Sequence, residues 1–189
     1  WDSLNDMALI GATKKGGVNR QTLTDLDKES RDLFVKWCKA ENLSISIDQI
    51  GNIFARRKGK NNDLPPIMSG SHLDTQPTGG RYDGALGVLA ALEVVRTLNE
   101  NNYITEAPIE IAMWTNEEGC RFPPSMTGSA VFTGQHNLKE ALSIKDPDLL
   151  ISCIKDNVES PIFVVEFSTA VFTKDHELQR ADNLVVCNK

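Results

Sequence analysis

The sequence predicts an α/β fold, in which helices flank a mixed sheet. Helix patterns with apolar residues at helical spacing alternate along the chain with short apolar strand patterns. Acidic and histidine residues follow two of the predicted strands, and in sheets of this kind ligands gather beyond the carboxyl ends of the strands. The sequence therefore also predicts a functional site at one edge of the sheet.

Each element has its own local signal. The helix over 23–40 has apolar residues on one face and Thr24 or Asp25 as its cap, and the helix over 84–99 is the clearest in the sequence. Residues 58–66 form an exposed turn that contains two prolines. Strands are predicted at 44–47 and 52–56, buried strands at 67–71 and 108–114, and a further helix and strand at 149–157 and 161–167.

Composition narrows the class of protein. The chain has 189 residues, of which 40% are hydrophobic and 24% charged, and this suits one soluble globular domain. The net charge of -6 argues against nucleic acid or an anionic membrane as partner, and no apolar run approaches the roughly 20 residues of a membrane span. No signal peptide is indicated. The sequence predicts a cytoplasmic protein with reduced thiols, because its cysteines are far apart: Cys38, Cys120, Cys153 and Cys187.

The segment over 69–87 is the most informative part of the sequence. It places His72, Asp74 and Asp83 beside a glycine-rich turn and ahead of a helix, while Glu117 and Glu118 follow the strand over 108–114. Imidazole and carboxylate groups both bind zinc, a carboxylate can bridge two ions, and a free carboxylate beside them can take a proton from water. These residues therefore suit half of a two-metal hydrolase site.

The amino-acid sequence of these segments resembles a known family. His-Leu-Asp at 72–74, Gly-Gly-Arg-Tyr-Asp-Gly-Ala-Leu-Gly at 79–87, Thr-Asn-Glu-Glu-Gly at 115–119 and Gly-Ser at 128–129 are similar to the amidase and carbamoylase branch of the M20 metallopeptidase family. That branch includes N-carbamoyl-L-amino-acid hydrolases, beta-ureidopropionases and allantoate amidohydrolases. The similarity runs over about 1–148 and implies a zinc-exopeptidase-like catalytic domain that hydrolyses a carbamoyl or ureido C–N bond in a small-molecule ureide or amide.

The resemblance also implies a role for each residue. His72 binds one zinc, Asp83 bridges two ions, Glu118 binds the second and Glu117 is the general base. Asp74, grouped with Glu117 as a catalytic residue, accepts the other imidazole proton of a ligand and fixes its tautomer. The two divalent ions are expected to be Zn²⁺, with Mn²⁺ or Co²⁺ as alternatives. Plainer roles remain open: a core histidine, a turn aspartate at Asp74, a helix cap at Asp83 and a solvated pair of glutamates.

The sequence also departs from this family. It lacks the further ligand histidines and the lid domain through which full-length relatives are expected to form homodimers, and His136 and His176 lie in no such motif. We therefore expect one partial catalytic domain over 1–189, family-like over 1–148 and divergent over 149–189, with no appreciable activity alone. An inactive remnant or partner-binding module, and an aminopeptidase of the wider family, are the alternatives. Substrate-binding residues are not predicted; Arg81 either supports the structure or touches substrate.

Overall fold

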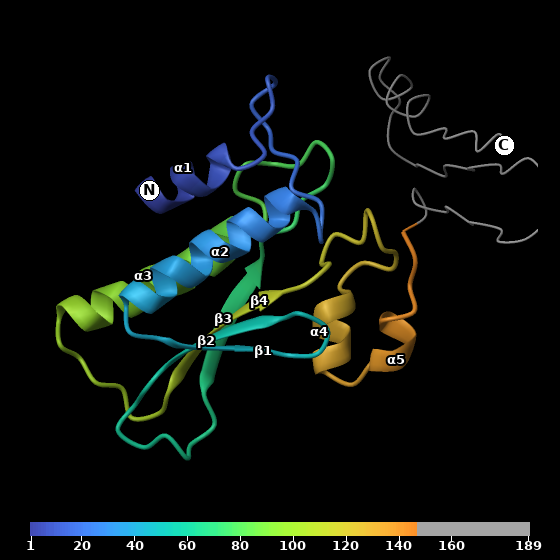
Figure 1. The fold of residues 1–189 in the computed structure, drawn as a ribbon. Helices are drawn as coiled ribbons and strands as arrows, with labels where there is room; N and C mark the ends of the chain where they lie inside the picture. The colour runs from blue at the N-terminus through green and yellow to red at the C-terminus, as the bar shows by residue number, and fades with distance from the viewer. Residues whose placement is uncertain (147–189) are drawn as a thin grey trace, which may run out of the picture. The chain divides into compact units, whose positions relative to one another are not determined.

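The computed structural model describes residues 1–146 (Figure 1). The predicted helix at 149–157, the strand at 161–167 and the residues Cys153, His176 and Cys187 lie outside the described residues. Within the described part, Trp1–Ser143 forms a compact unit. Its elements are α1 (Asp2–Leu9), α2 (Asp25–Ala40), β1 (Ser44–Ile47), β2 (Ile53–Arg57), β3 (Ile67–His72), α3 (Ala85–Glu100), β4 (Ile109–Trp114), α4 (Thr127–Phe132) and α5 (Leu138–Ala141).

The four described strands form one mixed sheet in the order β1-β2-β4-β3. β1 and β4 each pair with β2 in antiparallel fashion, whereas β3 and β4 are parallel and place His72 opposite Trp114. The predicted mixed sheet with flanking helices is confirmed. Because the parallel strands β3 and β4 end at the same edge of the sheet, the segments that follow them emerge together.

One face of the sheet carries the hydrophobic core. Inward residues of β2 and β4 pack with the apolar faces of α2 and α3, which cross that face side by side (Figure 1). On the opposite face, Phe132 of α4 packs against Phe54 and Trp114, with ring centroids 5.4 and 5.2 Å apart. Among residues 1–146, no helix has the length and apolar character needed to cross a membrane.

Most predicted elements lie within two residues of their observed bounds. Thr24 caps α2, since its side chain accepts a hydrogen bond from the Asp27 N–H at 3.2 Å. The prediction of a buried strand at 67–71 was wrong for its first half: β3 lies at an edge of the described sheet, and Ile67 is 66% exposed. An apolar run does not distinguish an edge strand from a central one. The helices α1, α4 and α5 were not predicted.

Candidate metal centre

Three candidate ligands converge at the carboxyl end of β3 and β4. His72 is the last residue of β3, Glu118 lies in the turn after β4, and Asp83 lies two residues before α3. One ligating atom from each residue lies within 4.8 Å of the corresponding atoms of the other two. As predicted, the segments that carry these residues lie close together at one end of the sheet. The donor set of one imidazole and two carboxylates suits a divalent cation such as zinc.

His72 is held with one ring nitrogen directed away from the cluster. Its Nδ1 lies 2.8 Å from the carbonyl oxygen of Asp74, which can only accept, so this contact places a proton on Nδ1. Its Nε2 lies 3.3 Å from Oε2 of Glu117. Two electron-rich atoms at this distance need a proton or a cation between them. A buried imidazole held in this tautomer is preorganised to bind a metal through Nε2.

Asp74 orients the turn that carries Glu117 and Glu118, which we call the acidic turn. Its carboxylate, only 2% exposed at the residue level, accepts hydrogen bonds from the backbone N–H groups of Glu117 (3.3 Å) and Glu118 (3.1 Å). Asp74 accepts the imidazole proton through its backbone carbonyl, whereas Oδ1 of its carboxylate lies 3.7 Å from Nδ1 of His72. Burial raises the pKa of Asp74, while the two backbone N–H groups and His72 oppose that shift.

The two glutamates have different surroundings. Oε2 of Glu118 accepts a hydrogen bond from Gln76 at 3.0 Å, whereas its Oε1 is buried and has no hydrogen-bond partner among the described residues. A buried carboxylate oxygen without a partner is costly, and a bound cation would satisfy it. The Glu117 side chain is 32% exposed and remains accessible to water. The two residues therefore do not behave as a solvated pair.

Asp83 does not cap the helix that follows it. Gly84 is the N-cap of α3, with a φ of 64°, and the cap has no side-chain hydrogen bond. A Cβ at this position would lie 2.5 Å from Cε1 and 2.6 Å from Nδ1 of His72. Glycine is therefore needed here both for the backbone conformation and for the close approach of the imidazole. The exposed Asp83 carboxylate is left available to the cluster.

The other residues that the sequence singled out lie outside the cluster. Arg81 is exposed, and its guanidinium lies 5.6 Å from the ring centroid of Tyr82. His136 lies between α4 and α5 and is not part of the metal-ligand group found among the described residues. Cys120 lies in the loop after Glu118 with its surface largely exposed, and partial burial of its thiol together with the charge of that glutamate raises its pKa.

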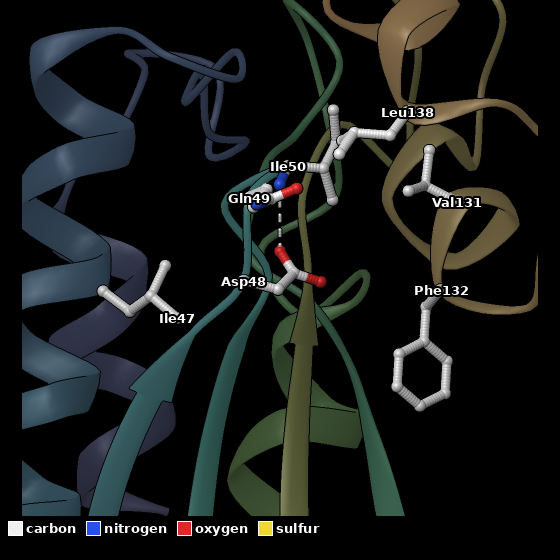
Figure 2. Close-up of a pocket in the computed structure, with 7 residues that line it drawn as sticks. All are labelled: Ile47, Asp48, Gln49, Ile50, Val131, Phe132 and Leu138. Carbon is white, nitrogen blue, oxygen red and sulfur yellow. Dashed lines mark hydrogen bonds between the residues drawn. The ribbon is translucent and has the colours of Figure 1, made fainter.

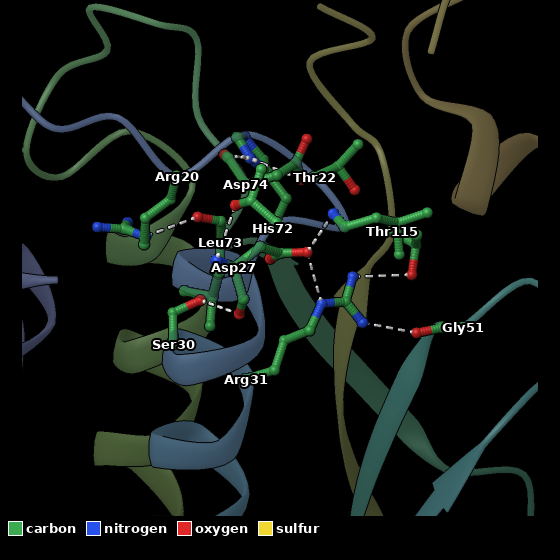
Figure 3. Close-up of polar contacts among 12 residues, drawn as sticks. Arg20, Thr22, Asp27, Ser30, Arg31, Gly51, His72, Leu73, Asp74 and Thr115 are labelled. Atoms are coloured by element: carbon green, nitrogen blue, oxygen red, sulfur yellow. Dashed lines mark hydrogen bonds and ion pairs between the residues drawn. The ribbon is translucent and has the colours of Figure 1, made fainter. Parts of the chain in front are cut away.

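A buried polar network lies beneath the cluster and was missed in the sequence (Figure 3). Arg20 is fully buried, and its Nε donates to the carbonyl of Leu73 at 3.1 Å, while Nη1 donates to the carbonyls of Met7 and Ile10. Burial lowers the pKa of Arg20, and the charges of Asp27 and Asp74 oppose that shift. The guanidinium therefore fixes the strand end that carries His72 and offsets the buried carboxylates.

Arg31 holds the end of the neighbouring strand in the same way. From α2 it pairs with Asp27 (3.1 Å), donates to the carbonyl of Gly51 (2.8 Å) and donates to the side-chain oxygen of Thr115 (3.0 Å), as Figure 3 shows. Thr115 directly follows β4 and precedes the acidic turn. No local motif marks these contacts with the strand ends, because Leu73 lies 53 positions from Arg20 and Thr115 lies 84 positions from Arg31.

An open hollow of about 420 Å³ lies between the turn after β1 and the helices α4 and α5. Figure 2 shows its lining and the hydrogen bond from the Ile50 N–H to Asp48, at 3.1 Å. The lining contains none of the candidate ligands; it consists of Ile47, Asp48, Gln49, Ile50, Val131, Phe132 and Leu138. The hollow is mainly apolar, and the candidate metal ligands lie in the cluster of His72, Asp83 and Glu118 instead.

Comparison with known proteins identifies the family. Residues 52–152 match the model of Peptidase family M28. The chain belongs to this family. It is 53% identical over 148 residues to an N-carbamoyl-L-amino-acid amidohydrolase of Rhizobium meliloti (78% of this chain, 36% of the relative). It is 32% identical over 141 residues to a ureidoglycolate hydrolase of Arabidopsis thaliana (75% of this chain, 30% of the relative).

A solved structure agrees with these relatives. The chain resembles a hydantoinase/carbamoylase family amidase from Burkholderia ambifaria, with 57% sequence identity and a TM-score of 0.76 over 77% of this chain and 36% of that one. The predicted resemblance to the amidase and carbamoylase branch of the M20 metallopeptidases is confirmed by these relatives, and the family model that matches is that of the related M28 peptidases. The chain spans about a third of the length of the curated relatives it matches.

Proposed function

We propose that the protein that carries this chain is a metal-dependent amidohydrolase that cleaves the carbamoyl or ureido C–N bond of an N-carbamoyl amino acid or related ureide. The observation that carries the proposal is the cluster of His72, Asp83 and Glu118, whose ligating atoms lie within 4.8 Å, with Glu117 at 3.3 Å from the imidazole. The names of the N-carbamoyl-amino-acid and ureidoglycolate hydrolases support the substrate class.

Two divalent ions are proposed, which His72, Asp83 and Glu118 would hold together. We propose Zn²⁺, with Mn²⁺ or Co²⁺ as substitutes. The unpartnered Oε1 of Glu118 and the unprotonated Nε2 of His72, which lies 3.3 Å from Oε2 of Glu117, support this assignment. When bound, such ions polarise a carbonyl and lower the pKa of a water molecule.

Glu117 is the proposed general base. Its carboxylate takes a proton from the attacking water as the water oxygen forms a bond to the carbamoyl carbon. The proton then returns to the leaving nitrogen as the C–N bond breaks, which releases the amino acid and carbamic acid; the latter decomposes to carbon dioxide and ammonia. Asp74 holds the backbone of Glu117 and Glu118 through both N–H groups, so the base and its neighbour stay in register.

Several finer features belong to this proposal. Homodimerisation through a lid domain, a cytoplasmic location and the absence of nucleic-acid and membrane partners are proposed from the resemblance, the thiol pattern and the net charge of -6. A single partial catalytic domain over 1–189 is likewise proposed. None of these features enters the chemistry of the cluster.

The decisive experiment measures metal content and turnover in the protein that carries this chain. N-carbamoyl amino acids, carbamoyl-beta-alanine, allantoate and a dipeptide are supplied with excess zinc, and ammonia or amine release is followed. We expect hydrolysis of a carbamoyl or ureido substrate and its loss in His72→Ala. Cleavage of the dipeptide alone would instead identify an aminopeptidase. If no substrate is hydrolysed with or without added zinc, the result would favour the remnant or partner-binding module.

A further inference from the structure

The acidic turn belongs to a longer loop whose two arms run side by side. Three backbone hydrogen bonds join the arms: the N–H of Gly128 to the carbonyl of Thr115 (2.9 Å), the N–H of Thr127 to that of Asn116 (3.2 Å), and the N–H of Met126 to that of Glu117 (2.7 Å). We call residues 115–128 the acidic loop and the junction of Thr115 with Gly128 its neck. The position of Glu117 and Glu118 therefore depends on how firmly the neck is held.

The neck is closed by one side chain from elsewhere in the sheet. Asn52, which immediately precedes β2, is fully buried. Its Oδ1 accepts a hydrogen bond from the N–H of Thr115 at 2.9 Å, and its Nδ2 donates to the carbonyl of Gly128 at 3.0 Å. The amide thus acts like a peptide group of a further strand. It pairs with the N–H of Thr115 and the carbonyl of Gly128, which are not used in the backbone hydrogen bond between these two residues.

Asn52 is itself fixed on its other side. Asp48 accepts hydrogen bonds from the Nδ2 and the backbone N–H of Asn52, both at 2.8 Å, and from the backbone N–H of Ile50. The carboxylate determines which end of the amide is nitrogen, because only the NH₂ group can donate to it. The donor must face Asp48 and Gly128, so the oxygen must face Thr115.

Packing leaves no second arrangement at this point. A Cβ on Gly128 would lie 2.2 Å from Oδ1 of Asn52 and 2.6 Å from the carbonyl oxygen of Thr115. Loop and amide are therefore in direct contact, without room for a side chain. A small displacement of the neck must be passed on to the residues that follow Thr115.

We propose that Asn52 is a positioning residue for the proposed hydrolysis, which holds the neck of the acidic loop so that Glu117 and Glu118 meet His72 and Asp83. The inference rests on the proposed function for its catalytic consequence. Asn52 touches neither the cluster nor a reacting atom, and it acts through the backbone of Thr115 and Gly128.

The test compares Asn52→Ala with Asn99→Ala. Asn99, on α3, is a matched control because its side chain also joins separate elements, donating to Glu41 and accepting from Arg57 at 2.7 Å, but does not contact the acidic loop. In Asn52→Ala we expect faster amide exchange in 115–128, zinc affinity lower by about 10-fold or more, and kcat lower by about 10- to 100-fold with KM nearly unchanged. Asn99→Ala should change none of these in the folded protein.

A second variant covers a failure of Asn52→Ala to fold. Asn52→Ser brings no charge beside Asp48 and keeps one polar atom, but its short side chain cannot bridge Thr115 and Gly128, so it should show the same pattern in weaker form. If either folded variant keeps wild-type zinc affinity, kcat and loop exchange, Asn52 is a structural residue only and the proposal is overturned. Amide exchange and zinc affinity need no turnover, so they still decide the role of Asn52 if the wild type fails to hydrolyse the chosen substrates.

Discussion

Replacing Gly84 with alanine tests whether the turn before α3 supports the metal-binding histidine. Gly84 has a φ of +64°, and an added Cβ would lie 2.5 Å from both Cε1 and the carbonyl oxygen of His72. With a ψ of −49°, Gly84 lies in a sparsely populated backbone region, where alanine costs about 1–3 kcal/mol. Overpacking costs about 1–3 kcal/mol more. We therefore expect a loss of about 2–6 kcal/mol in the free energy of unfolding, and a displaced imidazole.

The control for this variant is Gly134→Ala. Gly134 also has a positive φ, +74°, but nothing lies within 4 Å of its added Cβ. This variant carries the backbone cost alone, so the difference between the two isolates the contact with His72. Urea denaturation measures stability, and calorimetric titration with zinc measures affinity.

Zinc affinity should fall by about 10- to 100-fold in Gly84→Ala, as is usual when the support of a metal ligand is disturbed, and stay unchanged in Gly134→Ala. Equal zinc affinities in the two variants would refute the reasoning, because His72 would then tolerate a side chain where the structure leaves no room for one.

Three further predictions concern the cluster and the core. Glu117→Gln should retain bound metal while turnover falls by about 10²–10⁴-fold, whereas Glu118→Gln should lose metal. Metal analysis and kinetics measured together separate the two roles, and equal loss of metal and activity in Glu117→Gln would make Glu117 a ligand. Asp74→Asn cannot accept both backbone N–H groups and should lower kcat and zinc affinity together; unchanged zinc affinity would contradict this. Burial raises the pKa of the Cys38 thiol from 9.0 to about 12, so its contribution to the free energy of unfolding should be full below about pH 9 and be lost as the pH rises toward 12. Urea denaturation at several pH values should show a smaller loss in Cys38→Ala, and an equal pH dependence in the two proteins would disprove this cause.

The candidate ligands could be predicted because each is marked locally. His72 and Glu118 follow apolar strand patterns, and Asp83 precedes a clear helix, so the rule that parallel strands end at one edge was enough to bring them together. All four described strands also keep their predicted bounds within one residue. What the local pattern could not supply was the hydrogen-bond partner of each atom, as Asp74 shows by using its carbonyl for the imidazole.

The supporting residues could not be predicted because their contacts join distant parts of the chain. Arg20 contacts Leu73 across 53 positions, Asn52 contacts Thr115 across 63, and Arg31 contacts Thr115 across 84. A buried asparagine or arginine gives no periodic signal, and its role depends on the register of strands that the sequence does not specify. The helices α4 and α5 were missed for another reason, since six and four residues are too few to show helical spacing.

The buried charges beneath the cluster explain why Asp74 does not have to bind a metal. The charge of Arg20 and the two backbone N–H groups of the acidic loop favour the ionised carboxylate, which reduces the cost of burial without removing it, since burial still raises the pKa of Asp74. Asp83 and Glu118 have no such compensation from a described cation in an ion pair, and one oxygen of Glu118 has no partner. A carboxylate whose oxygens already accept hydrogen bonds is suited to positioning, whereas carboxylates left to repel one another favour a bound cation. The division of roles among neighbouring acids thus follows from where the protein places its own positive charges.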